Sequence, residues 1–251
     1  MSSDKRSQRP AGDASQAQAK TYYDDFSGWY ERERSRGYHV MLDDIEVAVA
    51  EPFARGKDIL EMGCGTGLIM RRLAPLARSA KGVDISPGMI ELAKERGLDV
   101  QLGSVTELPF EDQSFDLVYS FKVLAHIPDI GVALSEAARV TRPGGHMLLE
   151  FYNPLSLRYA AKRIAGPQRI SETRTEADMY TRWDSPFVIP KLLPPNVQLE
   201  GFRGVRVLTP AAFVHRVPVV GAALRRAESL VVDSPLRYFG GFLIAVLKRV
   251  D

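Results

Sequence analysis

A glycine-rich turn constrains this chain more than any other feature of its sequence. Residues 58–68 read DILEMGCGTGL, in which a short apolar run leads to Gly63, Gly65 and Gly67. The apolar run is typical of a buried parallel strand, and the apolar spacing after the glycines predicts a helix. Because glycine has no Cβ, it permits unusual φ angles and lets a ligand approach main-chain N–H groups at a helix start. The stretch therefore predicts a strand, a ligand-binding turn and a helix.

The spacing of these glycines distinguishes between two kinds of ligand. The dinucleotide-binding turn of Rossmann folds has the pattern G-x-G-x-x-G, whereas this chain has G-x-G-x-G with Glu61 two positions ahead. A carboxylate at this place repels a pyrophosphate and suits a ligand that carries an ammonium group. The stretch resembles the first motif of the class I S-adenosylmethionine (SAM) methyltransferases. A plain glycine turn of another α/β protein has the same pattern, so the interpretation depends on further motifs.

A second acidic residue follows at the expected distance. Residues 81–86, KGVDIS, predict a short strand that ends near Asp84. At this distance from the glycine turn, such folds place a carboxylate that accepts hydrogen bonds from the ribose hydroxyls. The alternative is that Asp84 is an N-terminal acid of a helix. Ser86 and Pro87, however, already supply the cap and first position of a helix that ends at Gly97.

Later segments extend the resemblance. A strand is expected over 98–105, where many family members carry G-D-A and this chain has Ser104, a weaker neutral partner for the adenine amino group. Residues 108–120, LPFEDQSFDLVYS, match the turn and fourth strand of the family. His126 falls on a family histidine, which either transfers protons or hydrogen-bonds to the loop backbone. A helix over 130–140 and a Pro-Gly-Gly turn lead to a fifth strand expected at 146–152.

The resemblance also implies the residues of the site. Those that bind SAM, or its product S-adenosylhomocysteine (SAH), are Glu61, Gly63, Cys64, Gly65, Thr66, Gly67, Asp84, Ile85, Met89, Ser104, Val105, Phe121 and Tyr30. The candidates for taking a proton from the acceptor are His126, Tyr22 and Tyr23. Methyl transfer is an in-line displacement, so alignment of the nucleophile matters most and a strong base is not required. No metal is expected, because the histidines are scattered without ligand spacing.

Composition fits one α/β domain. A chain of 251 residues, 45% of them hydrophobic, can bury a large core. The resemblance implies a seven-stranded, doubly wound, mostly parallel sheet with an antiparallel last strand and helices on both faces. The last two strands are expected over 202–208 and 240–248, with a helix over 219–232 between them. A net charge of +2 gives no overall attraction to nucleic acid, and the single cysteine, Cys64, favours a cytoplasmic location.

Three segments lie outside the minimal fold. Residues 1–20 are polar and predict a disordered leader, and no stretch has the apolar length of a membrane span. Residues 21–54 predict two lid helices whose aromatic residues pack in the core, close over SAM and substrate, or do both. Residues 154–195 predict an inserted cap with a helix over 155–164. Basic residues in the cap are typical of a solvated helix face, and less often of contact with nucleic acid or an anionic membrane.

We therefore expect a SAM-dependent methyltransferase that modifies an O or N atom of a small, largely apolar molecule. Apolar residues of the lid and cap, such as Phe26, Trp29 and Phe187, favour such a molecule over a polymer. Residues 120–123, SFKV, lack the Asn/Asp-Pro-Pro-aromatic motif of nucleic-acid adenine methyltransferases. Three other functions stay open. They are a nicotinamide-dependent dehydrogenase, which would use the same sheet but should show G-x-G-x-x-G, a SAM-binding protein without transferase activity, and a methyltransferase of RNA or protein. The acceptor and the oligomeric state, including a homodimer, are also open.

Overall fold

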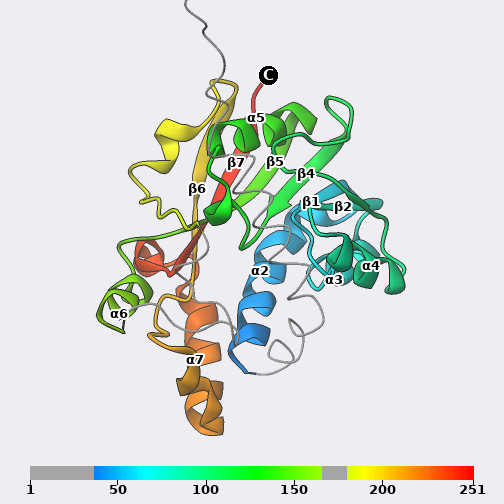
Figure 1. Cartoon of the computed structure of the whole chain (residues 1–251). Coiled ribbons are helices and arrows are strands. Elements are labelled where there is room, and N and C mark those ends of the chain that lie inside the picture. The colour runs from blue at the N-terminus through cyan, green and yellow to red at the C-terminus, as the bar shows by residue number, and fades with distance from the viewer. Residues whose placement is uncertain (1–36, 166–179) are drawn as a thin grey trace, which may run out of the picture.

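The computed structural model describes residues 37–165 and 180–251. Within them lies a seven-stranded sheet of order β3-β2-β1-β4-β5-β7-β6 (Figure 1). The strands are β1 (Asp58–Met62), β2 (Ser79–Asp84), β3 (Val100–Leu102), β4 (Phe115–Ser120), β5 (Thr141–Tyr152), β6 (Val197–Val205) and β7 (Phe242–Arg249). The pairs from β3 to β5 are parallel, whereas β7 is antiparallel to both β5 and β6. The predicted fold class, with one antiparallel last strand, is confirmed.

The largest differences from the predicted strand boundaries are in the third, fifth and sixth strands, while β2 begins at Ser79 and not at 81, and β7 occupies Phe242–Arg249 and not 240–248. The third strand, expected over 98–105, ends at Leu102, because the Ser104 hydroxyl folds back and accepts the Thr106 N–H at 3.2 Å. The fifth begins at Thr141, five residues before the expected start at 146, and so includes the Pro-Gly-Gly turn. The sixth occupies Val197–Val205 and not 202–208. Arg206 has a φ of +58°, which ends the extended backbone there.

The helices follow the sheet in the expected order. They are α2 (Tyr38–Ala54), α3 (Met70–Leu73), α4 (Pro87–Glu95), α5 (Ile130–Val140), α6 (Leu157–Ala165) and α7 (Pro218–Val231). The predicted cap of α4 is present, since the Ser86 hydroxyl accepts the Met89 N–H at 3.2 Å. The helix after the glycine turn is short, because a 3₁₀ turn that contains Pro75 follows it directly. α5 coincides with the predicted 130–140 helix.

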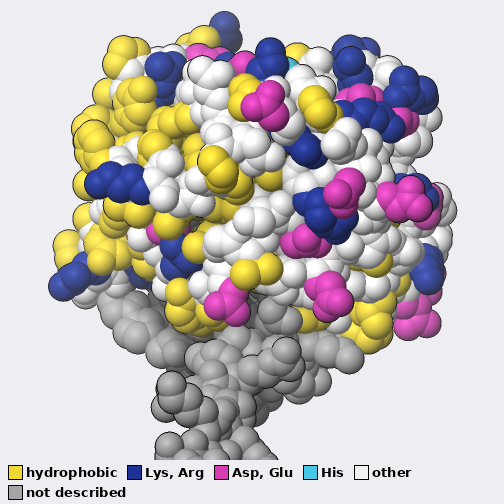
Figure 2. Space-filling view, turned by 90° about the horizontal axis from the view of Figure 1, so that it is seen from above, with side chains coloured by type: hydrophobic (Ala, Val, Ile, Leu, Met, Phe, Trp, Pro, Cys, Tyr) yellow, Lys and Arg dark blue, Asp and Glu magenta, His cyan; other side chains and the backbone are white. Residues whose placement is uncertain are grey.

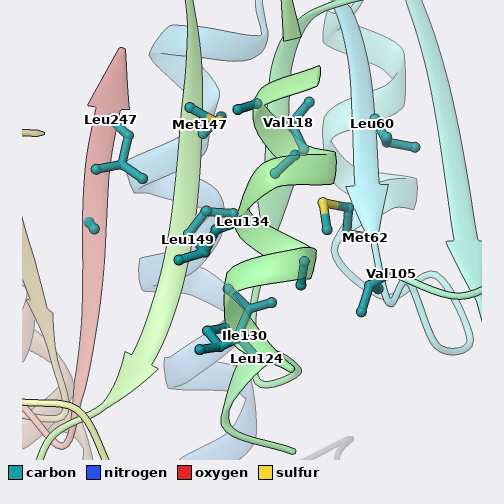
Figure 3. Packing of buried hydrophobic residues seen from close by; sticks show 14 of the residues in the cluster. Leu60, Met62, Val105, Val118, Leu124, Ile130, Leu134, Met147, Leu149 and Leu247 are labelled. Atoms are coloured by element: carbon teal, nitrogen blue, oxygen red, sulfur yellow. The ribbon is translucent and has the colours of Figure 1, made fainter. Parts of the chain in front are cut away.

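A hydrophobic core lies on each face of the sheet. On one face, Leu60, Val118 and Met147 belong to the cluster that contains the buried residues of α5. Their neighbours along the strands, such as Ile59 and Leu117, belong to the cluster around α2 on the other face. Successive strand residues point to opposite faces, so strands that are apolar throughout need a helix layer on each side. Figure 3 shows α5 in front of the strands and α2 behind them.

The described parts of the inserted cap, within residues 154–195, lie at the carboxyl ends of the parallel strands. Its first part forms α6, which begins at Leu157 and not at 155 because the Ser156 hydroxyl caps it by accepting the Tyr159 N–H at 3.1 Å. After the gap, the Arg182 N–H donates to the Ala125 carbonyl and the Asp184 N–H donates to the Tyr152 carbonyl, both at 2.8 Å. The described parts of the predicted cap thus lie beside the site-bearing edge of the sheet.

Some predictions lie outside the described residues. They concern the leader over 1–20, the first lid helix before α2, and the central part of the cap. The predicted division into leader, lid, core and cap therefore stays a prediction.

Candidate functional site

The glycine turn follows β1 and is bonded to β2. The Gly63 and Cys64 N–H groups both donate to the Val83 carbonyl, at 2.7 and 3.0 Å. Gly63 has a φ of +75°, and a Cβ built there would lie 2.4 Å from the Val123 side chain. Both the backbone conformation and the lack of space require glycine at this position.

The same turn meets the acid at the end of β2. The Gly65 N–H donates to Asp84 Oδ2 at 2.8 Å, while Asp84 Oδ1 accepts the Ser86 N–H at 3.0 Å. Gly65 has a φ of +53°, and no heavy atom lies within 4 Å of the position that its Cβ would take. Open space at Gly65 therefore adjoins a carboxylate, as a ligand with a ribose requires.

Glu61 lies on β1, directly before the turn, and its side chain is buried. The Tyr119 hydroxyl donates to Glu61 Oε2 at 3.2 Å. Burial raises the pKa of Glu61 to about 8, although the Tyr119 hydrogen bond and the charge of Lys122 act in the opposite direction. Without a cation beside it, the carboxyl is therefore mostly protonated at neutral pH. A bound ammonium group would favour the ionised form.

The other residues predicted to bind the cofactor, in the turn and just after β2, differ in how far their side chains are buried. Cys64 is buried, with its Sγ 3.0 Å from the position that a Cβ of Gly82 would take, and burial raises the pKa of its thiol, so it is no nucleophile. The Thr66 hydroxyl is buried and has no hydrogen-bond partner among the described residues. Met89 is buried beside its helix cap, whereas Ile85 is partly exposed.

The residues predicted to lie beside the adenine are packed more closely against the rest of the chain than the sequence suggested. The Ser104 hydroxyl lies 2.8 Å from the Thr106 hydroxyl, so it is already engaged by its own turn. Val105 and Phe121 are buried in the two hydrophobic cores, which leaves their backbone rather than their side chains for a ligand. Figure 3 shows Val105 on the α5 side of the sheet, near Met62. Their role in binding adenine stays a prediction.

His126 lies at the carboxyl edge in a 3₁₀ turn, η2 (Leu124–His126), after β4. Its Nδ1 is 2.9 Å from the Tyr180 carbonyl, and its ring meets the Tyr152 ring edge-on at 5.6 Å. Although part of the ring is exposed, the packing around it lowers its pKa to about 4, because burial disfavours the charged form. The ring is therefore neutral at neutral pH. A neutral ring bonded to a carbonyl carries its proton on Nδ1 and a lone pair on Nε2.

The remaining acceptor-side predictions have mixed outcomes. Tyr22, Tyr23 and Tyr30, together with Phe26 and Trp29, lie outside the described residues. Phe187, predicted as part of an apolar cap, is 74% exposed. The aromatic residue that the insertion does bring to the edge is Trp183, whose ring lies 5.5 Å from that of Tyr152. Sequence periodicity did not single out Trp183, because the segment around it has no regular secondary structure.

Sequence reasoning also missed a buried charged cluster beneath the turn. Lys122 Nζ donates to Asp43 Oδ1 at 2.9 Å and to Glu46 Oε2 at 2.6 Å, and its main-chain N–H donates to Glu150 Oε1 at 3.0 Å. Glu61 is within electrostatic reach of the same lysine and carboxylates. One cation thus faces an excess of carboxylates, an arrangement that favours a positively charged ligand.

Among residues 37–165 and 180–251, no three His, Cys, Asp or Glu side chains are placed to hold a metal ion. No helix described in these ranges is long and apolar enough to cross a membrane. On the face shown in Figure 2, Lys and Arg are interspersed with Asp and Glu, and hydrophobic side chains gather mainly toward one side. That face carries no continuous basic track.

Comparison with known proteins agrees with this geometry. Residues 60–149 match the model of a methyltransferase domain. The chain is 35% identical over 126 residues to a demethylmenaquinone methyltransferase of Tropheryma whipplei, covering 44% of this chain and 52% of that protein. It is 29% identical over 154 residues to a ubiquinone biosynthesis O-methyltransferase of Azorhizobium caulinodans, covering 59% of each. The chain thus matches little more than half the length of these two relatives.

A solved structure extends the likeness over most of the chain. The SAM-dependent methyltransferase of Thermotoga maritima, described as a possible histamine N-methyltransferase, superposes with a TM-score of 0.64 at 19% identity, covering 92% of this chain and 99% of that one. This similarity supports the fold, while the domain match covers the glycine turn, Asp84 and His126. Residues 60–149 therefore match a methyltransferase domain, and the fold around them is the Rossmann-like fold of SAM-dependent methyltransferases.

Proposed function

We propose that this protein transfers the methyl group of SAM to an oxygen or nitrogen atom of a small, largely apolar molecule. The observation that carries the proposal is the hydrogen bond between Gly65 and Asp84, which joins the ligand-accessible turn to the acid suited to a ribose. The carboxylate excess around Lys122 supports it, because SAM carries a positive sulfonium and an ammonium group. The methyltransferase names of the relatives support the same reaction class.

The residues present fit the cofactor. Asp84 would accept hydrogen bonds from the ribose, Glu61 would face the ammonium group, and the turn from Gly63 to Gly67 would lie against the main part of the ligand. The buried Thr66 hydroxyl, which has no partner among the described residues, adds a polar group on the turn itself. When bound, SAM supplies an electrophilic methyl group.

The protein's own residues would mainly align the acceptor with the methyl group. Main-chain hydrogen bonds tie the segment over 180–184 to η2 and β5, so this segment would bound the acceptor side and limit the water that reaches it. The neutral His126 ring offers Nε2 as an acceptor for the proton of a hydroxyl, but its low pKa makes it a weak base. His126 would thus assist an acidic hydroxyl, whereas an amine would need only to arrive neutral.

A binding measurement distinguishes SAM, the proposed cofactor, from a nicotinamide cofactor. In calorimetric titrations we expect SAM and SAH to bind and NAD not to bind. Asp84→Ala should weaken SAH binding by roughly 2–4 kcal/mol, because two ribose hydroxyls lose a charge-assisted acceptor. Asp99→Ala, which removes an exposed carboxylate paired with Lys81, is the matched control. Unchanged SAH affinity in a folded Asp84→Ala variant would disprove the ribose assignment.

Transfer itself needs a second measurement. Incubation with SAM and a panel of phenols, carboxylic acids, amines and quinols, read by mass spectrometry, should show a product heavier by one methylene unit. Binding of SAM without any methylated product across such a panel would favour the alternative, a SAM-binding protein without transferase activity. Methylated RNA or protein in the same assay would move the substrate class to polymers.

A further inference from the structure

Arg158 is held by aromatic rings at the carboxyl edge of the sheet. It belongs to α6, and its guanidinium carbon lies 4.3 Å from the ring centre of Tyr152, 4.6 Å from that of Phe242 and 5.0 Å from that of Trp183. These rings come from the end of β5, the start of β7 and the returning end of the insertion. Cations are attracted to the faces of aromatic rings, so three separate segments position one positive charge.

The guanidinium has no polar partner within the described part of the chain. The structure gives Arg158 no hydrogen bond or ion pair to a described residue, and its Nη1 is buried without a partner. Neighbouring arginines differ: Arg206 donates to the carbonyls of Thr209 and Pro210 at 3.0 and 2.9 Å. A buried charged N–H that lacks an acceptor costs free energy. An anion brought to Arg158 would remove this cost.

The nearby carboxyl group of Glu150 does not take that role. Its Oε1 accepts the Lys122 N–H, while its Oε2 is buried without a partner and forms no ion pair with Arg158. Burial raises the pKa of Glu150 well above its usual range, and the charge of Glu46 adds to this effect. Burial therefore disfavours the charged form of Glu150, and this carboxyl group forms no bond that would compensate the charge of Arg158.

Arg158 also lies close to the candidate proton acceptor. The Tyr152 ring, on which Arg158 is stacked, meets the His126 ring edge-on at 5.6 Å. The positive charge of Arg158 is one of the influences that keep the His126 ring neutral. A small molecule whose reacting group reaches His126 can therefore place a second group against Arg158.

We propose that Arg158 binds a carboxylate of the methyl acceptor, so that the substrates are small aromatic or apolar carboxylic acids. This inference rests on the proposed function and specifies its substrate class. A carboxylate matches the planar fork of a single guanidinium. A phosphate dianion carries more charge than one guanidinium balances, and the neighbouring Arg206 is already bonded to two carbonyls. The surrounding rings suit an apolar or aromatic body attached to the carboxylate.

The test compares acids with amides of the same shape. The full-length protein, with and without saturating SAH, is titrated with benzoate and benzamide, salicylate and salicylamide, and cinnamate and cinnamamide. Calorimetry reports affinity, and fluorescence quenching that is lost in Trp183→Phe reports where the probe binds. At least one acid should bind about tenfold more tightly than its amide, because only the acid forms charge-assisted hydrogen bonds.

Variants of one helix supply the controls. Arg158→Gln should abolish the preference for the acid, and Arg158→Lys should retain part of it. Arg163→Gln, which removes an exposed arginine of the same helix, should keep it in full. Equal affinity of every acid and its amide, including no measurable binding of either, would overturn the proposal. An unaltered preference in a folded Arg158→Gln variant would also overturn it.

Binding of SAH or SAM is measured separately from the preference for the acid, so failure of one proposal can be distinguished from failure of the other. Binding of SAH together with equal acid and amide affinities removes the role of Arg158 and leaves the proposed transferase function standing. An acid preference that depends on Arg158, without any binding of SAH or SAM, supports the carboxylate site and removes the proposed function instead.

Discussion

Gly65 and Gly97 have similar backbones and different surroundings. Both have a positive φ, +53° and +74°, and neither has a heavy atom within 4 Å of the position of a Cβ. Gly97 follows α4, whereas Gly65 donates to Asp84 at the candidate site. An alanine at either position pays a similar conformational cost of about 1 kcal/mol or more. Only at Gly65 would the added methyl also occupy the space left for a ligand.

We therefore predict that Gly65→Ala weakens SAH binding by about tenfold or more, while Gly97→Ala stays within about twofold of the unaltered protein. Both variants should lose similar amounts of stability. Calorimetric titration with SAH and urea unfolding measure the two effects. Equal SAH affinities in the two variants would show that the ligand does not lie against Gly65.

Glu61 leads to a prediction about pH. Its pKa of about 8 means that the free protein holds a proton there at neutral pH, while a bound ammonium favours the carboxylate. Binding of SAH should therefore release a proton, and affinity should fall as the pH is lowered from about 8 to about 6. In Glu61→Gln this dependence should disappear and the affinity should be lower. Calorimetry in buffers of different ionisation enthalpy counts the protons, and no release in the unaltered protein contradicts the assignment.

At the scale of an element, β7 depends on one buried arginine near its end. Arg249 Nη1 donates to the carbonyls of Ala138 and Arg139 at 2.9 and 3.0 Å, and also to that of Thr141. These carbonyls end α5 and begin β5, so Arg249 ties the antiparallel strand to the helix layer. A methionine would fill the space but leave the carbonyls without their charged donor.

Arg249→Met should therefore lower the free energy of unfolding by about 2–4 kcal/mol. Arg203→Met, which removes an ion pair with the exposed Asp233, is the comparison and should cost about 1 kcal/mol or less. Urea unfolding followed by circular dichroism gives both values. Similar losses in the two variants would mean that the buried bonds of Arg249 contribute little.

The sequence predicted the helices and strands more accurately than the contacts between them. The helix over 130–140 was predicted to the residue, because its apolar spacing is regular, and Asp84 was correctly placed at the end of the second strand. The early end of β3 depends on a hydroxyl of Ser104 that bonds within its own turn. The ion pair between Lys122 and Glu46 joins residues 76 positions apart. No local pattern encodes such a pair.

At the scale of the whole molecule, the amino edge of the sheet is held by charges. Asp58 accepts hydrogen bonds from Arg78, Arg142 and Ser79, and Arg142 also pairs with Asp116 at 2.9 Å. These residues belong to β1, β2, β4, β5 and the adjoining loop. The hydrogen bond from Arg78 is the main reason that the pKa of Asp58 lies well below its usual range.

Because the pKa of Asp58 is lower in the folded protein, its ionised form stabilises the fold at pH values above its unfolded pKa of about 4. This stabilisation is lost as the pH falls toward the pKa of the folded state. Asp58→Asn should therefore be less stable than the unaltered protein at neutral pH, and the difference should shrink at about pH 3. Urea midpoints at both pH values test this. A difference that stays constant would assign the effect to packing, not to charge.

If both proposals hold, the two halves of the sheet serve different ligands. β1 and β2 position the glycine turn and Asp84, whereas β5, β7 and α6 position the aromatic rings around Arg158. β4 lies between them, and its end leads to Lys122 and His126. Substitutions around Arg158 would therefore change the molecule that is accepted without disturbing the turn. Such a division would allow a new acceptor to be bound after changes on only one side of the sheet.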